Sequence, residues 1–226
     1  MARKIEVVNY NPEWPKMFRE EARQIKKILG RNCVAVYHIG STSVKGMKAK
    51  PIIDIMPVVR DLAKVDALNP RFEALGYECM GEYGIPGRRF YRKGGDNRTH
   101  HVHIFAQSSQ TEIQRHLAVR GYLMSTPQKV KEYSDLKTYL AQAYSDDCEG
   151  YCEGKNEFMK QLETEALQWQ EKQNHVSRYM SVGMCLGMAI GCAFGAASGN
   201  MGTGMSTGMC IGLCLGLAYG SNKTKK

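Results

Sequence analysis

The sequence predicts an α+β fold followed by a glycine-rich helical hairpin, and three patterns support this prediction. Short β-type runs alternate with helical segments as far as Ala106, and only helical patterns follow. From residue 183 to residue 220 a glycine recurs at almost every fourth position, and residues 181–222 carry no charge. We therefore expect a domain over residues 1–170, a linker or helical continuation over 171–180 and a hairpin over 181–222.

The first half of the domain reads as strand, helix, strand, loop and strand. Residues 5–8 form a β-type run, and an Asn-Pro cap at 11–12 starts an amphipathic helix that ends at Gly30. Residues 33–39 read as a strand, residues 40–51 as a polar loop, and residues 52–59 as a nearly continuous apolar strand.

The second half contains one helix, three strands and then three helices. We expect a helix over 61–75, with a doubtful break at Asn69-Pro70. Strands follow at 77–80, 88–92 and 99–106, with turns at 84–87 and 94–97. Helices are expected over 111–124, over 125–144 after a Ser-Thr-Pro cap, and over 150–170.

The polar loop and the strand after it hold the residues best suited to chemistry. Glycine at position 40 allows a ligand to approach the backbone, and the hydroxyls of Ser41 and Thr42 can contact a phosphate. Lys50 adds positive charge at the end of the loop. Asp54 is an acid within an apolar strand, which is costly unless the carboxylate is paired or binds a metal. Asp54 is therefore the strongest candidate for a functional residue.

Four blocks, HIGSTSVKGMKAKPIIDI, RTHHVHIF, RHLAVRGYL and SDLKTYLA, resemble the GrpB family in the same order. The resemblance covers roughly residues 3–165, and that family is similar to the nucleotidyltransferase superfamily. It implies a nucleotidyltransferase-like mixed sheet flanked by helices. It also implies that Gly40, Ser41, Thr42 and Lys50 contact nucleotide triphosphate, and that Asp54 binds Mg²⁺ or Mn²⁺ for nucleotidyl transfer.

Members of that superfamily share a Gly-Ser turn followed by a strand that carries two acids two residues apart. This sequence departs from that pattern at the second acid. Two residues after Asp54, where that acid is expected, the chain has Met56. His101 and His103 lie on one face of the later strand and could complete a metal site with Asp54, as ligands or proton shuttles. Such a set suits a transition metal better than Mg²⁺, which prefers oxygen ligands.

Plainer interpretations of these residues remain open. Asp54 could pair with Lys50 or an arginine, and His38 and His103 could be core histidines. Arg115 and Arg120 suit phosphate binding, but they do not share one helix face, so one is expected to be surface charge. Lys137 and Lys155 are expected to lie on solvated helix faces.

Charge and cysteine usage limit the possible partners. The chain has 31 Lys and Arg against 22 Asp and Glu, a net charge of +9, which favours anionic small molecules and is too diffuse to indicate nucleic acid. Its eight cysteines form no CxxC pair, which argues against a zinc ribbon, and Cys148 and Cys152 are expected to be buried thiols. With no signal peptide evident, we expect a cytoplasmic domain.

The tail is expected to associate with a membrane or to self-associate through residues 181–222. Glycines at this spacing resemble a glycine zipper and permit close helix packing. Residues 180–198 approach the length of a bilayer span, a link at 200–203 could reverse the chain, and basic residues flank both ends at 172, 178, 223, 225 and 226. A soluble hairpin, packed on itself or on a second copy, and a disordered segment are the alternatives. Two functions are thus open: nucleotide or phosphate binding, with or without transfer, and catalytically silent assembly at a membrane.

Overall fold

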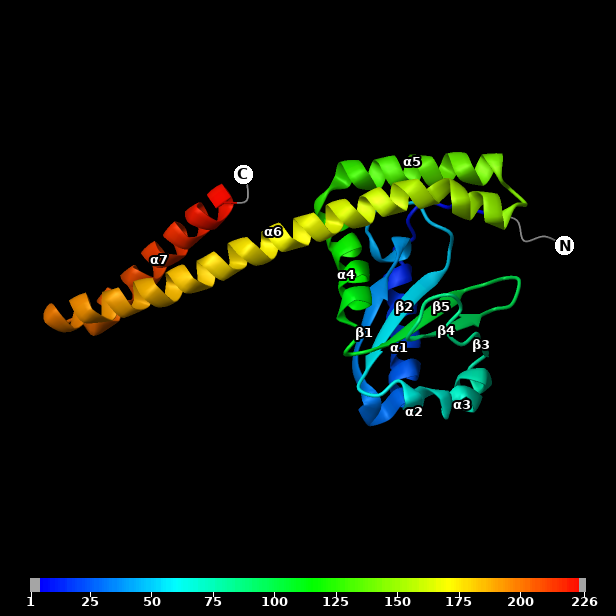
Figure 1. The fold of residues 1–226 in the computed structure, drawn as a ribbon, viewed down its shortest axis with the longest axis horizontal. Helices are drawn as coiled ribbons and strands as arrows, with labels where there is room; N and C mark the ends of the chain where they lie inside the picture. The colour runs from blue at the N-terminus through cyan, green and yellow to red at the C-terminus, as the bar shows by residue number, and fades with distance from the viewer. Residues whose placement is uncertain (1–4, 224–226) are drawn as a thin grey trace. The chain divides into compact units, whose positions relative to one another are not determined.

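A five-stranded mixed sheet forms the centre of the first of two structural units (Figure 1). The computed structural model describes residues 5–223, and the chain divides into Met1–Ala166 and Leu167–Lys226. The strand order is β1-β2-β5-β4-β3, in which β2 and β5 are parallel and the other neighbours are antiparallel. The strands are β1 (Cys33–Ile39), β2 (Ile53–Val59), β3 (Tyr77–Cys79), β4 (Arg88–Lys93) and β5 (His100–Ala106).

Helices surround this sheet and continue alone after β5, as the α+β prediction required. The first three are α1 (Trp14–Leu29), α2 (Ala63–Asp66) and α3 (Asn69–Ala74). After the sheet come α4 (Gln110–Ser125), α5 (Pro127–Ala143), α6 (Cys148–Ala197) and α7 (Met201–Lys223). The helical connector expected at 171–180 lies within α6.

Three local predictions differ from the structure. The helix expected over 61–75 is two short helices, because the doubtful break is real: α2 ends at Asp66, and α3 begins at Asn69 with Pro70 in its first turn. The β-type run at 5–8 contributes only a bridge between Val8 and Ala49. The first helix begins at Trp14, since Asn11 accepts a hydrogen bond from the amide of Glu13 before the helix starts.

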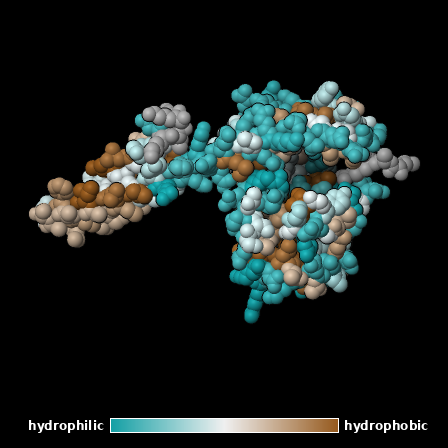
Figure 2. All heavy atoms as spheres, viewed as in Figure 1, coloured by the Kyte–Doolittle hydropathy of each residue, from teal (hydrophilic) through white to brown (hydrophobic). Residues whose placement is uncertain are grey.

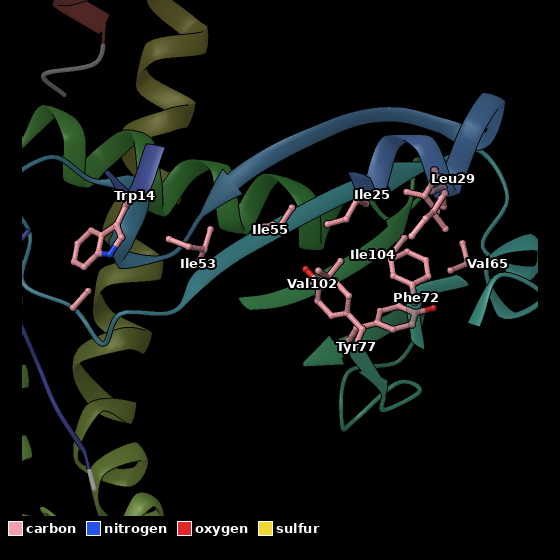
Figure 3. Close-up of a cluster of buried hydrophobic side chains, with 14 residues drawn as sticks. Trp14, Ile25, Leu29, Ile53, Ile55, Val65, Phe72, Tyr77, Val102 and Ile104 are labelled. Carbon is pink, nitrogen blue, oxygen red and sulfur yellow. The ribbon is translucent and has the colours of Figure 1, made fainter. Parts of the chain in front are cut away.

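Alternation along β2 separates the two faces of the sheet. Ile53, Ile55 and Val59 pack on one face against α1, α2 and α3, in the cluster drawn in Figure 3. Met56 and Val58 pack on the other face with Phe105 of β5 and Ile113 of α4. Asp54 shares the parity of Met56 and therefore lies on the α4 face.

The second unit is a helical hairpin whose two halves meet through their glycines. A methyl group built on Gly183 or Gly187 of α6 would collide with the backbone of α7, at Gly212 and Gly208 respectively. The chain reverses at residues 198–200, where Gly199 has a φ of 74°. The reversal thus comes slightly earlier than the link predicted at 200–203, since Met201 already begins α7.

With the glycines turned inward, large apolar side chains cover the outside of this hairpin (Figure 2). They include Val182, Leu186, Ile190 and Phe194 on α6, and Ile211, Leu215, Leu217 and Tyr219 on α7. By length and composition, both helices contain a window apolar enough to cross a bilayer. The flanking charges predicted at 225 and 226 lie outside the described residues.

Candidate functional site

Asp54, His101 and His103 come together on the α4 face of the sheet. Asp54 is directly opposite His101 in the parallel pairing of β2 with β5, and His103 follows two residues later on the same face. Asp54 Oδ1 lies 3.3 Å from His101 Nδ1 and 3.6 Å from His103 Nε2. The sequence therefore identified three side chains whose potential ligand atoms lie within 4.8 Å of one another.

The spacing of these atoms suits a bound ion. Both separations exceed the usual N–H···O hydrogen-bond distance. Two ligands placed tetrahedrally around an ion at bond lengths of ~2.1 Å would lie roughly 3.4 Å apart, close to the observed values. Burial would raise the pKa of Asp54, but the two histidines outweigh burial and hold this pKa below its usual range. Asp54 is therefore anionic at neutral pH.

The hydrogen-bond partners of the two histidines differ. Arg88, which is always protonated, donates to Nδ1 of His103 at 3.3 Å, so neutral His103 carries its proton on Nε2, facing Asp54. Burial lowers the pKa of His103. The buried Nε2 of His101 has no hydrogen-bond partner among residues 5–223. A metal could thus use Asp54 and His101 directly, whereas coordination by His103 requires the Arg88 contact to shift.

Gly40 fits tightly against this carboxylate. Its φ of 68° favours glycine, and a Cβ at this position would overlap the Asp54 side chain. The turn after β1 can therefore lie beside the acid only because residue 40 lacks a side chain. Gly40 and Asp54 therefore depend on each other: the acid occupies the space that any side chain at position 40 would need.

A cleft of about 620 Å³ opens next to these residues. Its walls come from the turn after β1, the α4 face of the sheet, α4, α5 and the start of α6. Five basic side chains line it, against the two acids Asp54 and Glu163: Lys50, Arg98, Arg115, Arg120 and Lys155. The excess of positive charge makes this cleft suitable for a polyanionic ligand.

Lys137 is an important residue that the sequence analysis assigned to a solvated surface. Its side chain is buried, with the residue only 3% exposed, and Nζ donates to Ser41 Oγ at 3.0 Å and to the carbonyl of Lys48. The ammonium also lies over the Tyr133 ring. Burial, reinforced by the charge of Lys155, lowers the pKa of Lys137 to about 7. No sequence signal separates it from other helical lysines, because its burial depends on how α5 packs against the loop.

The residues predicted to contact phosphate differ in the contacts that their side chains already make. Ser41 and Thr42 both line the cleft, but the Thr42 hydroxyl is hydrogen-bonded to His38 and to the Ile52 carbonyl. Lys50 also lines the cleft, where its ammonium lies 3.8 Å from the centre of the Tyr151 ring.

The two predicted arginines, Arg115 and Arg120, both reach the cleft. Arg115 pairs with Glu112 and Glu163 at 2.8 and 2.7 Å. The buried Nε of each arginine has no hydrogen-bond partner in the described part of the chain, but among these residues only Arg115 is paired with carboxylates. Arg120 is therefore the arginine more open to a ligand.

The structure also shows where Cys148, Cys152 and Met56 lie relative to the cleft. Cys148 and Cys152, expected to be buried, are exposed on the first turns of α6 and line the cleft, so that prediction was wrong. Met56 is fully buried in the apolar cluster under α4. A core side chain therefore occupies the position at which the superfamily resemblance predicted a second acid.

A family model, "GrpB protein", matches residues 4–165, and this match contains the whole cleft. The chain belongs to the GrpB family. It is similar to the crystal structure of conserved protein GrpB from Enterococcus faecalis, with 48% identity and a TM-score of 0.71 over 73% of this chain and 99% of that one. The structural match thus confirms the fold of the domain.

Two other relatives of this GrpB member are longer. "UPF0157 protein YqkA" of Bacillus subtilis is 42% identical over 77% of this chain, and the match spans about half (51%) of that protein. A "dephospho-CoA kinase" of Mycolicibacterium paratuberculosis is 25% identical over 73% of this chain and 46% of that protein.

Proposed function

We propose that the GrpB unit binds a nucleotide, or a comparable phosphate-bearing compound, together with a divalent metal. One observation carries the proposal: the five basic side chains and the set of Asp54, His101 and His103 face the same cleft. Basic side chains alone would suit any anion. Their proximity to a possible metal site favours a ligand that needs both, as polyphosphates do.

Asp54, His101 and His103 are the residues that would hold the metal. Two imidazoles and one carboxylate suit Mn²⁺ or a later transition ion better than Mg²⁺. When bound, such an ion would neutralise phosphate charge and polarise a P–O bond. Asp54 contributes the negative charge of the set, and Gly40 allows the turn after β1 to pack directly against this carboxylate.

The phosphate would lie between the turn after β1 and the basic side chains of the helices. Ser41 lines the cleft, and Lys137 already donates to its hydroxyl, so this hydroxyl is oriented before any ligand arrives. Arg120 can provide a planar guanidinium for phosphate oxygens, and Lys155 adds charge from α6. Arg115 would join them only by leaving Glu112 or Glu163.

Binding is better supported than nucleotidyl transfer. A two-metal transfer needs additional carboxylates, and buried Met56 stands where the second one would be. The similarity to a protein named as a dephospho-CoA kinase supports a nucleotide-like or CoA-like ligand. We therefore assign the cleft to binding of such a ligand.

Calorimetric titration of the full-length chain in mild detergent tests this assignment. ATP, CTP, CoA and tripolyphosphate would be added with Mn²⁺, with Mg²⁺ and with chelator. We expect at least one to bind, more tightly with Mn²⁺, and we expect Asp54→Asn to remove the metal dependence. Asp135→Asn, which changes an exposed acid on α5, is the matched control. Absence of binding by all four ligands, or equal binding by the Asp54 variant, would refute the assignment.

We further infer that the hairpin attaches the protein to a membrane. The supporting observation is that the glycines are used between the two helices, which leaves the large apolar side chains on the outside. Such a surface is costly in water and favourable in lipid. Removal of residues 178–226 should move the protein from the membrane pellet to the soluble fraction. An unchanged distribution would contradict this second proposal.

A further inference from the structure

Tyr83 occupies an unusual position at the edge of the cleft. It is the one non-glycine residue with a positive φ, 45°, among residues 5–223, and it is 56% exposed although it lines the cleft. A bulky residue in this backbone conformation is uncommon and costs conformational energy. A large ring held in this way, yet largely open to solvent, requires a physical reason.

A buried arginine holds the turn that carries Tyr83. Arg88 donates from Nη2 to the Tyr83 carbonyl at 2.7 Å and from Nε to the Glu82 carbonyl at 3.2 Å. The Gly87 amide, in turn, donates to the Glu82 side chain at 2.7 Å. Since Arg88 also contacts His103, the same side chain ties this turn to the candidate metal site.

The Tyr83 ring continues a row of rings that reaches the same site. It stacks on Phe90, with ring centres 5.3 Å apart and planes inclined by 24°. Phe90 is buried, and its ring lies 5.3 Å from His101 and 4.9 Å from His103. Tyr83 is thus the solvent-facing end of an aromatic row that starts at the candidate metal ligands.

We propose that Tyr83 is the stacking surface for an aromatic ring of the ligand, which makes the ligand a nucleotide with its base over Tyr83. This inference rests on the proposed phosphate site and goes beyond it, because phosphate binding alone does not require a base. Aromatic rings bind bases of any sequence through their faces. Asp54, His101 and His103 would then hold the metal ion, the basic side chains would contact the phosphates, and Tyr83 would contact the base.

A purely structural role explains the observations less well. Phe90 packs against the Tyr83 ring and the Arg92 guanidinium lies 5.9 Å from the centre of this ring, yet more than half of the residue stays exposed. The fixed turn instead positions the ring before binding, which reduces the entropy lost when a ligand stacks on it. The inference therefore predicts a defect for ligands with a base and none for ligands without one.

Titration of ATP and tripolyphosphate into the full-length chain with Mn²⁺ tests this prediction. Tyr83→Ala should weaken ATP binding about 5- to 140-fold, the equivalent of ~1–3 kcal/mol for one stacked base. Its affinity for tripolyphosphate should stay unchanged. Tyr83→Phe should keep the wild-type preference for ATP because it keeps the ring. Tyr139→Ala, which removes an exposed ring from α5, is the matched control.

The outcomes separate this inference from the phosphate proposal. Equal ATP affinity in wild type and Tyr83→Ala, or equal losses for both ligands, would overturn the stacking role while the phosphate site stands. If the wild type binds none of ATP, CTP, CoA and tripolyphosphate, both proposals fail together. A loss confined to ATP, rescued by phenylalanine, supports the assignment.

Discussion

Replacement of Lys137 by methionine should make the free energy of unfolding less dependent on pH. The side chains have similar length, but the variant lacks the buried amine. In the wild type, burial lowers the pKa of this lysine from 10.5 to about 7. Within the described residues no carboxylate forms an ion pair with it, so the charged form is held without an acidic partner. A pKa difference of this size corresponds to about 5 kcal/mol when the amine is fully charged in both states.

The sign of the effect follows from proton binding. Between pH 7 and about 10.5 the unfolded chain binds more protons at this lysine than the folded chain, so stability from this group rises with pH. The lowered pKa of Lys137 reduces the free energy of unfolding by about 4 kcal/mol at pH 7 and by about 2 kcal/mol at pH 9. Relative to the Lys137→Met variant, the wild type should therefore gain roughly 2 kcal/mol over this interval.

Urea unfolding of both proteins at pH 7 and pH 9, followed through the fluorescence of buried Trp14, measures this difference. Other titrating groups cancel, because they are common to the two proteins. Lys131→Met on the exposed side of α5 should show no such pH dependence. If the difference between wild type and variant is the same at both pH values, the amine is not held charged in a dry environment. The same variant should bind tripolyphosphate more weakly, since Ser41 loses its oriented partner.

Three further predictions concern the turn, the cleft and the hairpin. Gly40→Ala should cost at least ~2 kcal/mol in a urea titration because of its positive φ and the overlap with the carboxylate on β2, whereas Gly46→Ala, with a φ of 82° and open space, should cost roughly 1 kcal/mol; equal costs would contradict the close approach. Glu163→Gln should strengthen tripolyphosphate binding several-fold in calorimetry, because it removes an acid from the cleft and releases a guanidinium; weaker binding would oppose this account. Gly208→Leu should lower the melting temperature of the hairpin in detergent by circular dichroism, while Gly202→Leu, which faces open space, should not; matching curves would show that the helices do not pack through glycine.

Local sequence determined much of the architecture, because strands, helices and turns depend on short-range periodicity. Alternation placed His101 and His103 on one face of β5, and the pairing of β2 with β5 brought Asp54 beside them. Blocks spread along the domain indicated the family. The glycine spacing also predicted a close helix pair. The alternation within β5 and the glycine spacing depend on residues a few positions apart, so one sequence was sufficient to find them.

Tertiary packing decided the rest of the candidate site. Lys137 meets Ser41 across 96 residues of chain, and only the packing of α5 against the loop makes a helical lysine a buried donor. Tyr83 became notable through a backbone angle and through Arg88, which no periodicity encodes. Contacts between distant segments depend on the relative placement of whole elements, so sequence named the acid and the histidines while the fold supplied the cleft around them.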